Sequence, residues 1–189
     1  MPYWRIQDLT FSHPKNRHSI RLKDYDYTQS GAYFITLVTY QRENRFGKII
    51  NREMKINEYG EIVVNEWKKS ALIRAEIELD VYVVMPNHFH AIVYITDNFD
   101  VHRCRGDRPI APTTTISAGP TPKSIGALVA GFKSAVTHQI NQKCLTSGLP
   151  VWQRNYYEHI IRNEKSFLKI RRYILENPMQ WEQDSLHVA

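Results

Sequence analysis

Residues 77–96 read IELDVYVVMPNHFHAIVYIT, and this stretch decides the fold. Two runs within it, 77–85 and 88–96, are rich in the β-branched and aromatic residues that fit a pleated, half-buried surface. Pro86 and Asn87 lie between the runs and favour a turn. The pattern therefore predicts a hairpin of two antiparallel strands.

The segments on either side of the hairpin predict two more strands and three helices. β-Branched and aromatic residues predict a strand at 32–40, and strand-like alternation returns at 151–161. Apolar residues at helical spacing predict helices at about 57–72, 124–143 and 164–176. This order predicts an α+β fold, a ferredoxin-like split βαβ antiparallel sheet with an added C-terminal helix.

The length of 189 residues fits a single domain with one sizeable core. We expect that domain at 31–181, after an N-terminal extension at 1–30 and before a tail at 182–189. Residues 97–122 contain four of the nine prolines and predict a flexible insertion. No apolar run approaches the roughly 18 residues of a membrane span, so we expect a cytoplasmic protein without a membrane partner.

Positive charge gathers in the second half of the chain. The net charge is +6, but residues 123–172 alone contain nine basic and two acidic residues. Aromatic residues are interleaved with these charges. That combination suits single-stranded nucleic acid, because cations track its backbone and rings stack on its bases. A solvated helical face accounts for the same charges equally well.

The histidines of the predicted hairpin, His88 and His90, are two residues apart. Side chains alternate along a strand, so both point to one side, whereas Phe89 and Ala91 point to the other. Adjacent imidazoles can chelate a divalent ion. Crossover helices cover one face of a split βαβ sheet, so we expect the histidine face to stay open to substrate. Surface histidines on strands are also common, and the pair alone leaves both interpretations open.

Tyr173 and Asn177 are four residues apart on the last predicted helix and share one face with Lys169. A phenol is a competent nucleophile toward a phosphodiester when a metal polarises the phosphate, and its aryl phosphate product keeps the bond energy for rejoining. The position of Tyr173 also suits a residue that only flanks the core. Tyr156 and Tyr157 are rival nucleophiles in a predicted strand.

Three motifs, taken together and in this order, resemble those of a known family. They are MPNHFHAIV at 85–93, WQRNYYEHIIRN at 152–163 and RYILENP at 172–178. Over about residues 31–181 the chain resembles the HUH-type single-stranded DNA transposases of the IS200/IS605 class, and within it the REP-associated tyrosine transposases.

The resemblance implies a ferredoxin-like core with a metal site. It implies that His88 and His90 are metal ligands, and that Tyr173 attacks DNA to form a 5′-phosphotyrosine bond. A polar residue one turn beyond the tyrosine completes the site in that family, which here is Asn177, although Glu176 is adjacent. The implied ion is Mg²⁺ or Mn²⁺, and imidazole ligands suit Mn²⁺ better.

The resemblance also implies single-stranded or hairpin DNA as the partner, bound by a homodimer or by a monomer. Five basic residues near the nucleophile would hold phosphates: Arg162, Lys165, Lys169, Arg171 and Arg172. Tyr157 or His159 would support the site, with a structural role favoured for His159. We therefore expect a metal-dependent DNA endonuclease and strand transferase. A domesticated protein that binds hairpins without cutting them is an alternative, and so is a hydrolase of small phosphoesters.

Overall fold

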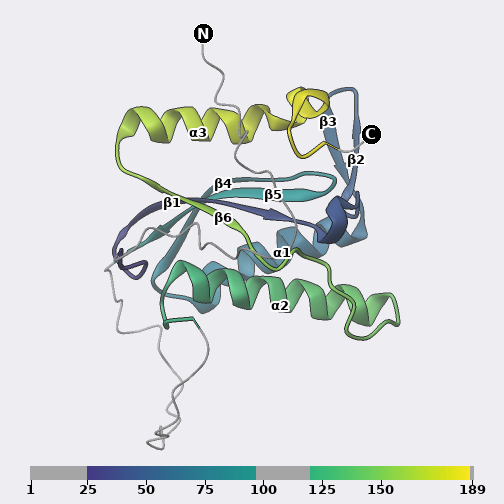
Figure 1. Cartoon of the computed structure of the whole chain (residues 1–189), viewed down its shortest axis with the longest axis horizontal. Helices are drawn as coiled ribbons and strands as arrows, with labels where there is room; N and C mark the ends of the chain where they lie inside the picture. Colours follow the sequence, from purple (N-terminus) through teal and green to yellow (C-terminus); the bar gives the residue numbers. More distant parts are fainter. Residues whose placement is uncertain (1–24, 97–119, 188–189) are drawn as a thin grey trace, which may run out of the picture.

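The computed structural model describes residues 25–96 and 120–187, in which helices pack on both faces of a central sheet (Figure 1). Most of the expected N-terminal extension, 1–24, lies outside the described residues. The same holds for most of the expected insertion, 97–119, and for residues 188–189.

Four strands form one antiparallel sheet in the order β4-β5-β1-β6. These strands are β1 (Gly31–Val38), β4 (Ile77–Val84), β5 (His88–Ile95) and β6 (Tyr157–Ile161). Because β5 is antiparallel to both of its neighbours, β1 and β4 run parallel with β5 inserted between them, which is the split βαβ arrangement. The structure therefore confirms the predicted α+β, ferredoxin-like sheet.

Two helices lie on one face of the sheet and the third lies on the other (Figure 1). The first two are α1 (Glu58–Ile73) and α2 (Ile125–Lys143), and the third is α3 (Glu164–Glu176). A small hairpin and two 3₁₀ helices complete the described chain: β2 (Gly47–Ile50), β3 (Glu53–Ile56), η1 (Tyr40–Arg42) and η2 (Asn177–Gln183). Within 25–96 and 120–187, no helix combines the length and apolar character needed to cross a membrane.

Each α-helix begins after a polar residue whose side chain accepts hydrogen bonds from the first turn. Asn57 does so for α1, Ser124 for α2 and Asn163 for α3. These caps satisfy backbone N–H groups that have no partner inside the helix. Local sequence therefore sets where the helices begin, and α3 spans the residues predicted for it.

The main core lies between the sheet and the helices α1 and α2. Phe89 of β5 is fully buried there, and its ring centroid lies 5.0 Å from that of Trp67 in α1 and 5.5 Å from that of Phe132 in α2. Ala91 and Val93, which alternate with the histidines, are fully buried in the same core. One face of β5 is thus devoted to apolar packing.

The last strand is shorter than the predicted segment 151–161, because β6 begins only at Tyr157. Upstream of it, the Lys133 amine in α2 donates hydrogen bonds to the carbonyls of Gln153 and Arg154. These two carbonyls are therefore paired with a side chain instead of a neighbouring strand.

Residues just outside the expected 31–181 domain also pack against it. Tyr27 is buried in the main core, and Leu186 is buried with an exposed fraction of 1%. The carbonyl of Leu186 accepts a hydrogen bond from the Asn87 side chain at 2.7 Å. This hydrogen bond therefore holds the segment after η2 next to the histidine pair.

Candidate metal and nucleophile site

His88 and His90 lie side by side on the α3 face of β5, with ring centroids 4.5 Å apart. Neither imidazole is exposed, and the ring of Trp181 in η2 lies 5.8 Å from that of His88. The expectation of an open histidine face is therefore wrong. The physical reason is that α3 and the residues after it pack over the face that α1 and α2 leave uncovered.

Asn87 determines which nitrogen of His88 carries the proton. The Asn87 amide donates to the carbonyls of Arg42 at 3.2 Å and Leu186 at 2.7 Å, so its Oδ1 is an acceptor. His88 Nδ1 lies 2.9 Å from that oxygen and must donate to it. His88 Nε2 therefore carries a lone pair, and it is buried without a hydrogen-bond partner among the described residues.

His90 is held between a threonine and the candidate nucleophile. Its Nδ1 lies 2.8 Å from the Thr36 hydroxyl, and its Nε2 lies 3.2 Å from the Tyr173 hydroxyl. A protonated phenol can donate to Nε2, and in that tautomer the proton of His90 is on Nδ1, facing Thr36. In that tautomer both imidazoles present Nε2 as the acceptor.

Burial keeps the imidazoles and the phenol neutral. Loss of water lowers the pKa of His88 to about 4, against the opposing effect of the Asp184 carboxylate. Burial, with a smaller contribution from His88, lowers the pKa of His90 well below its usual range. Burial raises the pKa of Tyr173, and Asp184 adds to that effect. At neutral pH the histidines thus offer lone pairs to a cation, while the tyrosine keeps its proton.

Asn177 is buried one turn beyond Tyr173 and belongs to the same cluster. Its Nδ2 donates to Asp184 Oδ2 at 3.0 Å, whereas its Oδ1 has no hydrogen-bond donor among the described residues. The same side chain also raises the pKa of His88 and lowers that of Tyr173, which places it beside both groups. The structure brings Asn177 to the histidine pair, and its role as a metal ligand stays a prediction.

Asp184 joins the site although the sequence analysis assigned it no role. One carboxylate oxygen of Asp184 and one ring nitrogen from each of His88 and His90 all lie within 4.8 Å of one another. The backbone N–H of Leu186 fixes the carboxylate by donating to Oδ1 at 2.7 Å. Asp184 belongs to the expected tail 182–189, beyond the predicted end of the last helix, so the helical pattern was not extended to it.

The cluster fits a divalent cation. It combines two neutral imidazole nitrogens, a carboxylate and an amide oxygen, all on buried or half-buried side chains. His88 Nε2 and Asn177 Oδ1 are buried acceptors without a donor among the described residues, an arrangement that is unfavourable unless something positive satisfies them. A mixed nitrogen and oxygen donor set suits Mn²⁺ better than Mg²⁺, which prefers oxygen ligands and retained waters.

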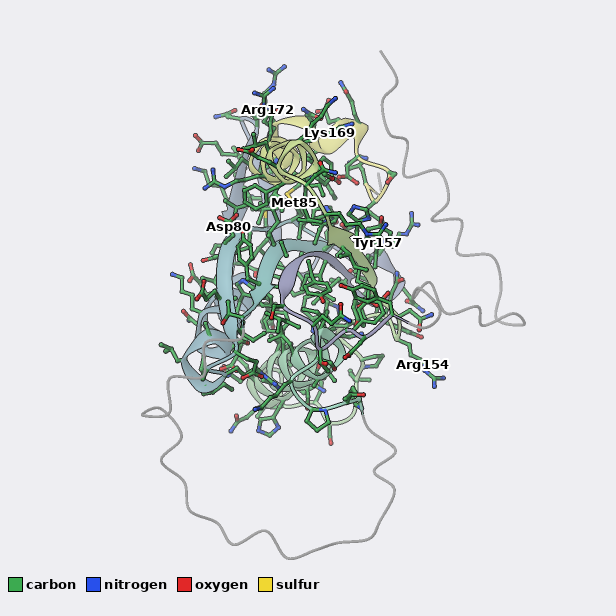
Figure 2. The ribbon with its side chains drawn as sticks, turned by 90° about the vertical axis from the view of Figure 1, so that its left-hand side faces the viewer. Asp80, Met85, Arg154, Tyr157, Lys169 and Arg172 are labelled. Atoms are coloured by element: carbon green, nitrogen blue, oxygen red, sulfur yellow. The ribbon has the colours of Figure 1, made fainter. Side chains whose placement is uncertain are left out.

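The five basic residues predicted to hold phosphates are all exposed: Arg162, Lys165, Lys169, Arg171 and Arg172. Their positions nevertheless differ. Arg171 forms an ion pair with Asp80 of β4 at 3.4 Å, at one edge of the sheet. Lys169 lies on the opposite side of the molecule, the side of Tyr157 in β6 (Figure 2). The helix α3 therefore presents its cations to both edges of the sheet.

The two rival tyrosines differ in their surroundings. Tyr156 packs against the main core, and its hydroxyl donates to Glu158 Oε2 at 2.7 Å. Tyr157 lies on the α3 face, with its ring centroid 6.1 Å from that of Phe34. Among the tyrosines of the described residues, Tyr173 is the one hydrogen-bonded to a histidine of the pair.

Comparison with known proteins agrees with this architecture. No protein-family model matches the chain. An uncharacterised protein of Haemophilus influenzae is 41% identical over 173 residues, which cover 92% of this chain and 94% of that protein. A second Haemophilus influenzae protein, assigned by inference as a REP-associated tyrosine transposase, is 25% identical over 174 residues, covering 86% of this chain and 83% of that protein. Among solved structures, a REP-associated tyrosine transposase bound to a REP hairpin aligns with a TM-score of 0.50 at 19% identity, over 85% of this chain and 74% of that one.

Proposed function

Because this chain belongs to one family with the uncharacterised Haemophilus influenzae protein and resembles the REP-associated tyrosine transposases, we propose that it is a transposase. It cuts and rejoins single-stranded DNA beside a hairpin, with a divalent ion and through a 5′-phosphotyrosine intermediate. One observation carries the proposal. The Tyr173 hydroxyl lies 3.2 Å from His90 Nε2, so a nucleophile adjoins the residues that fit a cation.

In this mechanism Tyr173 is the nucleophile. Its oxygen attacks the phosphorus of the scissile phosphodiester, and a bond from that oxygen to phosphorus forms as the bond to the 3′ oxygen breaks. The phenol loses its proton to water, and the leaving 3′ oxygen gains one to become a hydroxyl. The 5′ phosphate stays on Tyr173, and attack by another 3′ hydroxyl reverses these steps and rejoins the strand.

The residues that would hold the ion are His88, His90, Asn177 and Asp184. A bound Mg²⁺ or Mn²⁺ supplies positive charge that polarises the phosphate and favours the ionised phenol. The protein contributes orientation, because the hydrogen bond from His88 to Asn87 keeps its Nε2 free of a proton. Burial limits the water around these groups, so their charges interact more strongly than they would in bulk solvent.

The partner in this proposal is single-stranded DNA that carries a hairpin. The exposed cations on and before α3 hold its phosphates, and contacts to bases specify the sequence. Among these cations, Arg171 is also engaged in an ion pair with Asp80. The hairpin bound to the solved structural neighbour supports this class of partner. Light scattering on the purified protein distinguishes action as a homodimer from action as a monomer.

A second candidate function is that of a hairpin-binding protein that does not cut. The burial of both histidines favours it, because neither imidazole is exposed and a phosphodiester must displace part of the covering chain to reach them. This function needs the basic surface and leaves Tyr173 without a chemical role. A hydrolase of small phosphoesters needs the histidines alone.

Covalent capture separates these functions. The protein is incubated with Mn²⁺ and a pool of labelled hairpin oligonucleotides with randomised single-stranded flanks, then run on a denaturing gel. We expect a band of protein joined to DNA for the wild type and for Tyr157→Phe, the control for a rival nucleophile. Tyr173→Phe abolishes the band because the attacking oxygen is gone.

Other outcomes contradict the proposal. Binding without an adduct supports the non-cutting protein, and an adduct that survives Tyr173→Phe shows that another residue attacks. Release of phosphate from a small aryl phosphodiester that persists in Tyr173→Phe supports the hydrolase.

A further inference from the structure

A row of residues crosses the α3 face of the sheet from the buried site to its edge. His90 of β5 pairs with Thr36 of β1, and Thr36 pairs with Tyr157 of β6. Neighbouring strands lie about 4.8 Å apart, so Tyr157 stands about 10 Å from His90 on the same face. In the next row, Phe34 of β1 pairs with His159 of β6. The edge strand β6 is thus separated from the histidines of β5 by the single strand β1.

The rings along this path are in contact. The Phe34 ring centroid lies 5.4 Å from that of His90, 6.2 Å from that of Tyr173 and 6.1 Å from that of Tyr157. Exposure increases outward, since Phe34 is buried, Tyr157 is half-buried and His159 is exposed. Ring contacts therefore lead from Tyr173 through the buried Phe34 to the half-buried Tyr157 at the edge strand.

Cations border the outer part of this surface. Arg162 follows β6 directly and is exposed, and it lowers the pKa of His159 in addition to the larger effect of partial burial. Lys169 of α3 lies on the same side as Tyr157, whereas Asp80 lies on the other (Figure 2). Flat rings beside positive charge are what single-stranded DNA requires, because bases stack on the rings and phosphates meet the cations.

We propose that Tyr157 and His159 form a stacking platform for a nucleobase of the DNA strand that enters the site. This inference rests on the proposed function and adds a binding subsite to it. The platform holds the strand through the faces of its bases, so it accepts any base and helps to place the neighbouring phosphate at Tyr173. Its partner is single-stranded DNA, because paired bases are stacked on each other and offer no free face.

The experiment measures binding without cleavage, in the full-length protein with the Tyr173→Phe background. The two probes are fluorescein-labelled oligodeoxythymidine of twelve nucleotides and the same backbone made entirely of abasic sites. Fluorescence anisotropy at low salt gives a Kd for each. Both probes carry the same phosphates, so the ratio of the two Kd values isolates the contribution of the bases.

We expect the background protein to bind the thymidine strand at least about fivefold more tightly than the abasic strand, the lower range for one stacked base. Tyr157→Leu should bring this ratio close to one, whereas Tyr157→Phe, which keeps the ring, should preserve it. His159→Ala should lower the ratio by a smaller factor. Tyr59→Leu is the matched control, since Tyr59 is a half-buried tyrosine on α1, across the sheet.

A ratio of one in the background protein overturns the platform, and so does a ratio that Tyr157→Leu leaves unchanged. If Tyr157→Leu alters the oligomeric state and not the ratio, the edge strand binds protein and the proposal fails. Failure of the proposed function has a different signature. In that case the wild type forms no covalent adduct, while the effect of Tyr157 on the ratio remains measurable.

Discussion

The two faces of the central sheet are built from the same strands yet have opposite characters. On the α1 and α2 face, β5 contributes Phe89, whose neighbours are the rings of Trp67 and Phe132. On the α3 face, the same strand contributes His88 and His90, which are equally buried. The first face is made mainly of apolar rings, although the indole nitrogens of Trp67 and Trp152 are buried there without a hydrogen-bond partner among the described residues. The second buries ionisable and polar side chains, and the unpartnered atoms there, His88 Nε2 and Asn177 Oδ1, are hydrogen-bond acceptors.

This difference shows that the two faces of one strand have different roles: one contributes to stability and the other carries the candidate chemical groups. Burial of apolar rings stabilises the fold by about 25 cal/mol per Å² removed from water. Burial of an unpaired polar atom destabilises it, by roughly 1–3 kcal/mol in protein mutational data. The α3 face is therefore retained at the expense of stability, which is expected of a functional site. Substitutions on the two faces should affect different measurements.

The largest effect on stability should come from the apolar face. Phe89→Ala removes a fully buried ring and should lower the free energy of unfolding by about 3–5 kcal/mol, measured by urea denaturation. Tyr173→Phe on the α3 face keeps its ring and should change that energy far less. Equal losses of unfolding free energy in the two variants would mean that both faces contribute equally to stability.

Acid should weaken the α3 face through the buried imidazoles. The pKa of His88 is about 4 in the folded protein and about 6.5 in the unfolded chain, so the unfolded chain binds the proton first as pH falls. The associated stability is complete above pH 6.5 and is lost between pH 6.5 and 4. The loss at pH 4 is about 3 kcal/mol from His88 alone. Urea denaturation of chelator-treated protein across this range measures it, and His88→Asn should flatten the curve.

A smaller effect should distinguish the carboxylates of the α3 face. Asp184→Asn removes a charge from the cluster and should weaken Mn²⁺ binding about tenfold or more, because affinity follows the charge of the ligands. Asp80→Asn is the control, since Asp80 is also half-buried but pairs with Arg171. Titration of Mn²⁺, followed by the electron paramagnetic resonance of the free ion, gives both affinities. Similar values for the two variants would remove Asp184 from the site.

The smallest effect should come from the outer surface of α3. Arg171→Ala breaks the ion pair between this exposed arginine and the half-buried Asp80, and it should change the free energy of unfolding by about 1 kcal/mol. It should also weaken binding of oligodeoxythymidine less than Lys169→Ala does, because Lys169 lies on the side of β6 (Figure 2). A larger loss with Arg171→Ala would indicate that DNA follows the β4 edge instead.

Local patterns in the sequence predicted most of the fold. Alternation along residues 77–96 predicted the hairpin, and apolar spacing with a polar cap predicted α3 from Glu164 to Glu176. The same alternation placed His88 and His90 on one face. Such features depend on residues within one helical turn or one strand, so they are visible as local patterns in the sequence.

Features that depend on distant contacts could not be predicted in this way. The cover over the histidines comes from α3 and from Trp181, and Asp184 reaches the site only because the segment after η2 folds back against Asn87. Upstream of β6, the carbonyls of Gln153 and Arg154 accept hydrogen bonds from Lys133 of α2, which is distant in the sequence. None of these contacts has a period or spacing that a sequence pattern could reveal.

The central position of β1 has a consequence for the speed of folding. Thr36 must find His90 across 54 residues and Tyr157 across more than twice that distance along the chain. Sheets joined by such distant contacts pay a large loop-closure entropy before any contact forms, and they fold slowly for their size. We therefore expect β6 to dock late, and until it does one edge of β1 is open to pairing with another chain.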